Sequence, residues 1–158
     1  MGRPMKFATK EDIECPIEHV FARAADFAGF ERQALRRGAN VRKTDSNERH
    51  GLGSGWDVIF KFRGKDRQLK AAITAWEPPN GYRITSTTSG IEAVVLVELV
   101  PLSRNRTRLS MSIELKPKTI GARIMVQSLK LARGTLQRRF DLRVADYASD
   151  IVERYRPV

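Results

Sequence analysis

The stretch Thr107-Arg108-Leu109-Ser110-Met111-Ser112-Ile113-Glu114-Leu115 decides the fold class. Its large apolar residues alternate with polar ones, a period of two that indicates a half-buried β-strand. Residues 120–155, which follow Pro117, contain no proline, and their apolar residues recur at seven-, four- and three-residue steps. These are Leu129, Leu136, Phe140, Val144, Tyr147, Ile151 and Tyr155. One helix over this range would be about 50 Å long and could cross a whole sheet.

Alternating runs also lie upstream of this strand. They predict a first strand over residues 5–14, then strands with inward residues Trp56, Val58, Phe60 and Phe62, then Leu69, Ala71, Ile73 and Ala75, then Tyr82, Ile84, Ser86 and Thr88. Val41–Asp45 is a weaker candidate strand, and residues 91–102 form a nearly continuous apolar one. Turns are expected at Gly64-Lys65-Asp66, at residues 77–81, at Ser89-Gly90 and at residues 103–105. Short connections at roughly 12-residue spacing indicate an antiparallel meander.

Two short helices are expected between the first strand and the rest. Pro16 ends the strand and suits the first turn of a helix, whose apolar face would be Ile17, Val20, Phe21, Ala24 and Ala25. A second helix is predicted around residues 27–37, ended by Gly38. The predicted fold is therefore α+β, with about seven antiparallel strands and one long C-terminal helix.

Length and composition limit the function classes. The 158 residues suit one domain, which we expect over residues 5–158 behind a flexible tail, residues 1–4. No apolar run approaches the ~20 residues that a membrane span needs, and no secretory signal is visible at the start. Cys15 is the single cysteine, which excludes an internal disulfide and, with only two histidines, nearly excludes structural zinc. A reducing, cytoplasmic location fits best.

Several local motifs together resemble the START-like or Bet v 1-like (SRPBCC) superfamily, and within it the polyketide cyclase/dehydrase and lipid-transport group. The first motif is the opening segment, in which a strand, Cys15-Pro16 and a helix are followed by Asp26-Phe27. The other three are Gly53-Ser54-Gly55-Trp56, Trp76-Glu77-Pro78-Pro79 and Thr107-Arg108-Leu109. The resemblance covers residues 5–155. It implies a helix-grip fold, in which the curved sheet and the long helix enclose an elongated apolar cavity that binds a small molecule.

Inward residues would line or fill that cavity. The expected ligand-binding residues combine an apolar wall with a few small or hydroxyl-bearing positions. They are Trp56, Val58, Phe60, Phe62, Ala71, Ile73, Ala75, Tyr82, Ile84, Ser86, Thr88, Met111, Ile113, Met125, Leu129, Leu136 and Phe140. Taken singly, each is more often an ordinary core residue than a ligand contact.

No catalytic constellation emerges from the sequence. His19 and His50 are expected to be exposed, Asp57 to point outward and Glu98 to face either way. Cys15 should be an inert, packed thiol. Gly51, Gly53 and Gly55 lead into a strand rather than a helix, so they suit a hairpin and not a nucleotide loop. We therefore expect no cofactor and no metal, and catalytic residues stay unassigned.

The charge of +11 leans toward the C-terminal end, where residues 118–158 carry nine basic and four acidic residues. Arg133, Arg138 and Arg139 mark a basic helix face that could meet a membrane or nucleic acid, or simply be solvated. The favoured function is binding of a lipid-, quinone- or polyketide-like ligand, as carrier or sensor. The alternatives are a cyclase or dehydratase acting on a cavity-bound substrate, and a basic module that docks on nucleic acid, ribosome or membrane.

Overall fold

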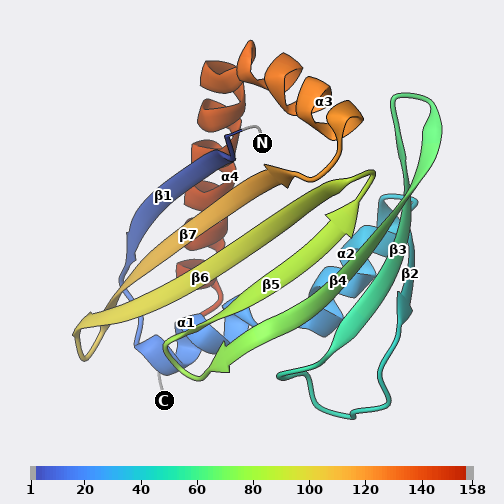
Figure 1. Ribbon diagram of the computed structural model, residues 1–158. Helices are drawn as coiled ribbons and strands as arrows, with labels where there is room; N and C mark the ends of the chain where they lie inside the picture. Colours follow the sequence, from blue (N-terminus) through green and yellow to red (C-terminus); the bar gives the residue numbers. More distant parts are fainter. Residues whose placement is uncertain (1–2, 156–158) are drawn as a thin grey trace.

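The computed structural model describes residues 3–155 and consists of one curved antiparallel sheet with helices against it (Figure 1). The sheet has seven strands in the order β1-β7-β6-β5-β4-β3-β2. The strands are β1 (Met5–Ile13), β2 (Asn40–Lys43), β3 (Gly55–Phe62), β4 (Lys65–Glu77), β5 (Gly81–Thr88), β6 (Ile91–Ser103) and β7 (Arg106–Pro117). The helices are α1 (Ile17–Ala24), α2 (Phe27–Arg36), α3 (Ile120–Lys130) and α4 (Arg133–Glu153).

The predicted fold class is confirmed, with two short helices after the first strand and a long helix at the end. From β2 to β7, each strand pairs antiparallel with the next one along the chain. β1 forms the other edge of the sheet and pairs antiparallel with β7, from Met5↔Leu115 to Ile13↔Thr107. Asp26 starts α2, because its carboxylate accepts a hydrogen bond from the backbone N–H of Gly29 at 3.1 Å. The helices α1, α2 and α4 lie on one face of the sheet (Figure 1).

Two apolar clusters lie between the helices and the sheet. The larger joins α1, α2, α4 and the middle strands, with Val20, Leu109 and Ile151 fully buried. The smaller lies under α3 and contains Met5, Phe7, Ile91, Ala122 and Val126. Phe140 contacts both clusters, so α4 connects the two ends of the core.

The single helix expected over residues 120–155 is a wrong prediction, because the chain breaks at Leu131 and Ala132 into α3 and α4. The last amides of α3 bond three residues back, Leu131 to Ser128 and Ala132 to Leu129, which is a tightened final turn. Figure 1 shows α3 set at a large angle to α4 at one end of the sheet. The break lets the apolar faces of both helices stay on the curved sheet, which one straight helix could not follow.

The expected inward position of Ala75 is also wrong. The register of β4 against β5 shifts between Ile73 and Ala75, so that Ala75 lies opposite Arg83 and Trp76 lies opposite Tyr82. Thr74 is the extra residue, exposed and hydrogen-bonded to Thr85 at 2.9 Å. A β-bulge reverses the alternation that follows it, so Trp76 faces inward in place of Ala75.

Other strand boundaries differ by a few residues from the predicted ones. β2 covers Asn40–Lys43 rather than Val41–Asp45, and the hairpin after β3 turns at Arg63 and Gly64, which both have positive φ of 54° and 77°. That pair of conformations forms a tight two-residue hairpin turn. No helix within residues 3–155 is long and apolar enough to cross a membrane. Of the tail expected at residues 1–4, the first two residues lie outside the described range, as do residues 156–158 of the expected domain.

Candidate functional site

An open cavity of about 530 Å³ lies between the inner face of the sheet and the helices α2 and α4. Every strand from β2 to β7 contributes to its wall, and α1 adds Ala24. From α2 come Phe27, Phe30, Glu31 and Ala34, and from α4 come Phe140, Arg143, Val144 and Tyr147. The strands supply Val41, Trp56, Val58, Ala71, Tyr82, Ile84, Val95, Val97, Met111 and Ile113.

Phe27 organises the aromatic end of the cavity. Its ring centroid lies 5.1 Å from that of Tyr82, 5.4 Å from that of Trp56 and 5.8 Å from that of Phe30. Trp76, the residue that the bulge turns inward, lies 6.2 Å away. These separations and tilted arrangements are those that aromatic pairs favour. The cavity therefore has a preformed aromatic wall at its α2 end.

The two tyrosine hydroxyls of the wall are already bonded to the backbone of α1. Tyr82 donates to the carbonyl oxygen of Ala24 at 2.6 Å, and Tyr147 donates to that of Arg23 at 2.7 Å. Burial raises the pKa of both phenols above the ordinary tyrosine value. Both therefore stay protonated at neutral pH and satisfy carbonyls of the last turn of α1.

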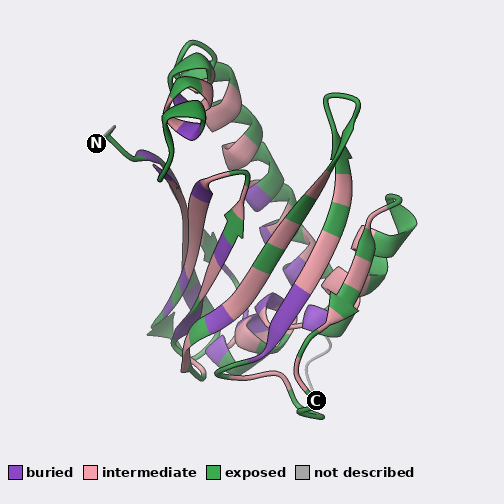
Figure 2. Cartoon of the chain, turned by 45° about the vertical axis from the view of Figure 1, so that its right-hand side comes forward, coloured by how far each residue is buried: buried purple, intermediate pink, exposed green. Residues whose placement is uncertain are grey.

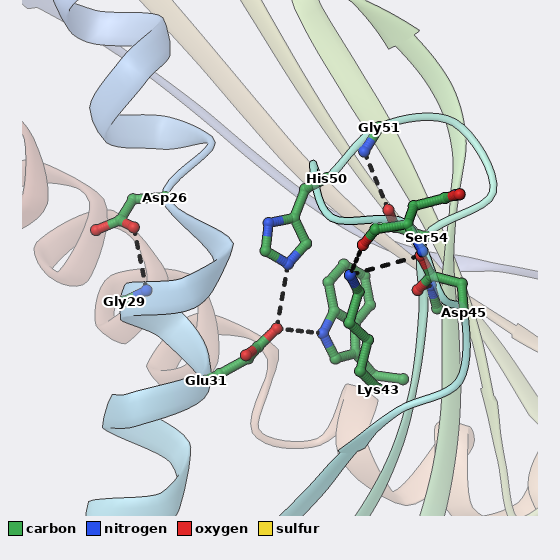
Figure 3. Close-up of polar contacts among 11 residues, drawn as sticks. Asp26, Gly29, Glu31, Lys43, Asp45, His50, Gly51 and Ser54 are labelled. Atoms are coloured by element: carbon green, nitrogen blue, oxygen red, sulfur yellow. Dashed lines mark hydrogen bonds and ion pairs between the residues drawn. The ribbon is translucent and has the colours of Figure 1, made fainter.

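Glu31 joins α2 to the loop before β3. Its Oε1 accepts a hydrogen bond from the indole Nε1 of Trp56 at 2.7 Å and another from Nε2 of His50 at 3.2 Å (Figure 3). The rings of His50 and Trp56 stack with their planes 18° apart and their centroids 5.7 Å apart. The three side chains form a cluster that we call the Glu31–His50–Trp56 cluster, and two of its members, Glu31 and Trp56, line the cavity.

Charge in the cavity is confined to two side chains. Among the lining residues, only Glu31 and Arg143 carry a formal charge at neutral pH. They come from α2 and α4, and they form no ion pair with one another within residues 3–155. An apolar wall with a few polar groups is typical of a small-molecule site, in which the polar groups orient the ligand.

The structure brings together about half of the ligand-binding residues expected from the sequence. Trp56, Val58, Ala71, Tyr82, Ile84, Met111, Ile113 and Phe140 line the cavity. Ser86 is buried and donates to the carbonyl oxygen of Ala93, and the Thr88 hydroxyl is buried without a hydrogen-bond partner among the described residues. Ile73 lies in the solid core with 1% of its surface exposed.

The other expected residues lie elsewhere. Met125, Leu129 and Leu136 pack in the smaller cluster under α3. Phe60 lines an adjoining, more polar depression together with Arg37 and Lys61. Phe62 is 43% exposed and does not line the cavity, because the β3–β4 hairpin extends beyond the helices that cover the sheet (Figures 1 and 2). The outward position expected for Lys61 holds, since that side chain is exposed.

Sequence reasoning missed the part of the cavity wall that α2 contributes. Phe27, Phe30, Glu31 and Ala34 lie at three- and four-residue steps and thus share one face of α2. That spacing was available in the sequence, but it reads equally well as an ordinary amphipathic helix. Val95 and Val97 were missed for a different reason: β6 is apolar on both faces, so no alternation marks its inner side.

The remaining catalytic candidates lie away from the cavity. His19 is half-buried rather than exposed, and its Nε2 donates to the carbonyl oxygen of Ile151 at 3.0 Å. Asp57 points outward as expected and pairs with Arg42 at 2.7 Å, and Glu98 is exposed. The Cys15 thiol is fully buried, and burial raises its pKa.

The glycine-rich loop pairs with β4 just before β3 begins. Its residues 53 and 54 exchange backbone hydrogen bonds with Ile73, and Gly55 begins β3, so no helix N-terminus is available for a phosphate. His50, expected in an exposed loop, is half-buried beside Glu31. Within residues 3–155, no group of three or more histidine, cysteine, aspartate or glutamate side chains could hold a metal ion.

No family model and no curated protein matches the chain in sequence. Solved structures do match it in shape. A protein from Thermus thermophilus is 14% identical with a TM-score of 0.66, covering 96% of this chain and 100% of that one. Norcoclaurine synthase from Thalictrum flavum, in complex with dopamine and hydroxybenzaldehyde, is 13% identical with a TM-score of 0.65, covering 99% and 90%. The Zhui aromatase/cyclase from a Streptomyces species is 12% identical with a TM-score of 0.63, covering 98% and 97%.

Proposed function

We propose that this protein binds a small apolar or amphipathic molecule in the cavity between the sheet, α2 and α4, and that it acts as a carrier or sensor. Its fold is the helix-grip fold of the Bet v 1-like, START-like proteins. The observation that carries this proposal is the cavity itself, with about 530 Å³ of space inside a wall of apolar and aromatic side chains. That volume lies within the range of about 300–1,000 Å³ typical of ligand pockets.

The chemistry of the wall indicates the ligand class. A lipid, a quinone or a polyketide-like ring system would bury apolar surface against Val58, Ile84 and Met111. Burial of ~300 Å² of apolar ligand surface at roughly 25 cal/mol per Å² gives a gross gain of about 7 kcal/mol, which the costs of association partly offset. The likeness to norcoclaurine synthase and to an aromatase/cyclase adds that this fold accommodates ring compounds in other proteins.

The test is a cavity-filling substitution with a matched control on the same strand. Ala71 lines the cavity, so Ala71→Phe should fill it, whereas Ala75 faces outward, so Ala75→Phe places the same ring on the outer face of the sheet. A thermal-shift screen with fatty acids, quinones, sterols and aromatic polyketides is run on both variants and the wild type, with mass spectrometry of solvent extracts.

We expect at least one class to raise the melting temperature of the wild type and of Ala75→Phe but not of Ala71→Phe. Circular dichroism establishes that both variants fold. The proposal is wrong if no compound shifts the wild type and nothing co-purifies, or if Ala71→Phe binds as tightly as the wild type.

A second candidate function is catalysis on a cavity-bound molecule, which the Glu31–His50–Trp56 cluster favours. Nε2 of His50 donates to the carboxylate of Glu31, and carboxylate–imidazole pairs serve as general acid–base groups in enzymes. Glu31 lines the cavity, so its carboxylate is the member of the pair that a bound carbonyl compound could contact directly. A cyclase or dehydratase needs such a group.

The two functions are separated by incubating each compound that binds with the wild type, with Glu31→Gln and with His50→Asn. Turnover by the wild type that both variants lose, with affinity retained, would establish catalysis. Unchanged compound after prolonged incubation with the wild type would leave the carrier or sensor function.

A further inference from the structure

The helix α3 carries large aliphatic side chains on its outer face. Ile120 is 76% exposed, Ile124 is 64% exposed, and Leu131, the first residue after the helix, is 92% exposed. At 100° per residue these three positions lie within about 40° of one another, so they form one ridge. We call these three residues the α3 ridge.

The α3 ridge is not part of the core. The opposite face of the same helix supplies Ala122 and Val126 to the smaller apolar cluster, where each is at most 2% exposed. That inner face already holds α3 on the sheet. The helix is therefore apolar on both sides, and its outer apolar side lies outside the buried core.

The sequence around the ridge is purely basic. Between Glu114 and Asp141 there is no acidic residue. The basic residues are Lys118, Arg123, Lys130, Arg133, Arg138 and Arg139, together with Lys116, which is paired with Glu92 and Glu114. On the helical wheel, residues 123 and 130 flank the ridge on one side, about 60° to 80° from Ile120. The ridge is thus apolar surface bordered by positive charge, with no acidic residue nearby in the sequence.

The β3–β4 hairpin exposes further apolar surface at the same end of the molecule as the α3 ridge. The β3–β4 hairpin and α3 both project from this end in two views of the chain (Figures 1 and 2). Phe62 at this hairpin is 43% exposed, and the guanidinium of Arg63 lies 5.2 Å above its ring. The hairpin repeats the combination of apolar and basic groups found on α3.

We propose that this end of the protein docks on the surface of an anionic lipid bilayer, with the α3 ridge at the boundary between headgroups and acyl chains and the basic residues on lipid phosphates. A bilayer offers apolar and anionic surface side by side, and basic amphipathic helices use both. Nucleic acid matches the charge, but exposed aliphatic side chains gain nothing from a phosphate backbone. Since no described helix can span a membrane, the contact lies in the interface plane.

The test is co-sedimentation of the full chain with vesicles of phosphatidylcholine alone and with about 30% phosphatidylglycerol added. We expect binding to the anionic vesicles only, weakened at physiological salt. Ile120→Ser/Ile124→Ser should lower the partition coefficient by roughly tenfold. Lys118→Gln/Lys130→Gln should lower it by at least a comparable factor at low salt, and its remaining binding should depend less on salt.

The matched control is Val100→Ser/Leu102→Ser, which removes two similarly exposed aliphatic residues from β6, at the opposite end of the sheet. It should bind as the wild type does, and unchanged thermal midpoints show that all variants fold. The proposal is overturned by equal binding to neutral vesicles, or by ridge variants that bind like the wild type. It is also overturned if the wild type is a dimer that the ridge substitutions dissociate, or if it binds DNA independently of the ridge while ignoring vesicles.

Discussion

The indole Nε1 of Trp56 donates to Oε1 of Glu31 at 2.7 Å and so connects the first residues of β3 to α2. Trp56 is 8% exposed, so its N–H has little access to water once that acceptor is removed. Glu31 holds this bond and the bond from His50 through the same oxygen. One carboxylate thereby links α2 to β3 and to the loop before it, at the wall of the cavity.

Replacing that carboxylate should destabilise the protein. Glu31→Leu leaves the buried indole N–H unpaired, and we expect a loss of about 1–3 kcal/mol in the free energy of unfolding, measured by urea denaturation. Glu31→Gln keeps an amide oxygen at that place and should lose less. Equal stability of the two variants would show that the bond from Trp56 contributes nothing.

The strands were predictable from sequence because most of them have one apolar face. The alternation in β7, from Leu109 to Leu115, and the burial of Met5, Phe7 and Ile13 in β1 follow the pattern of period two. With the two short helices and the final helical region, this pattern was sufficient for the fold class.

The wrong predictions concern structural features that the spacing of the apolar residues does not reveal. The bulge at Thr74 inserts one residue and reverses the side of Ala75 and Trp76, and no local composition marks it. The apolar stripe of α3 continues in phase into α4, so the break at Leu131 is invisible in the spacing. Phe62 alternates correctly but lies beyond the covered part of the sheet. The cluster of Glu31 with His50 joins residues 19 positions apart through a loop, which tertiary packing alone decides.

The free energy of unfolding should fall at alkaline pH because of the two buried, hydrogen-bonded tyrosines, Tyr82 and Tyr147. The pKa of Tyr82 is raised chiefly by burial, so around and above the ordinary tyrosine value of about 10 the unfolded chain loses this proton while the folded protein keeps it. The stabilising contribution is therefore complete below pH ~10 and declines as pH rises further, by up to about 1.4 kcal/mol per pH unit and group. Tyr82→Phe should be less stable at pH 7, by about 1 kcal/mol for the lost bond to Ala24, but should lose stability less steeply above pH 10.

Urea denaturation between pH 7 and 11 gives this slope, and absorbance at 295 nm follows ionisation of the phenols. Tyr147 has the same cause of a raised pKa, so Tyr147→Phe should behave similarly and the double variant should show both changes. A slope identical to that of the wild type in Tyr82→Phe would contradict the prediction.

Arg143 should make the cavity prefer ligands that carry a carboxylate. Arg143 lines the cavity and makes no ion pair within the described part of the chain, so a ligand carboxylate at the mouth would meet an uncompensated guanidinium. Arg143→Gln should weaken binding of a carboxylic acid about three- to tenfold and leave its methyl ester unchanged. Arg139→Gln, four residues earlier on α4 and outside the cavity wall, is the control and should alter neither affinity. Equal losses for acid and ester would place the headgroup elsewhere.

Alanine at Gly134 should stabilise the protein. Gly134 lies in the first turn of α4, where an added Cβ meets only the end of the Arg138 side chain at an ordinary 3.6 Å. Gly134→Ala removes freedom from the unfolded chain and should raise the free energy of unfolding by about 0.5–1 kcal/mol. Urea denaturation with an unchanged m-value measures this gain, and Gly121→Ala, whose Cβ would have no neighbour within 4 Å, is a second helical comparison. A loss of stability in both variants would contradict the helical geometry at these positions.

Alanine at Gly81 should have the opposite effect. Gly81 begins β5 with a φ of 148°, and a Cβ there would overlap the carbonyl oxygen of Val97 on the neighbouring strand. The sheet would have to open, so we expect Gly81→Ala to lower the free energy of unfolding by more than about 2 kcal/mol in the same urea experiment. If Gly81→Ala is as stable as the wild type, the close approach of β5 and β6 at this point is wrong, and with it the position of Tyr82 in the cavity wall.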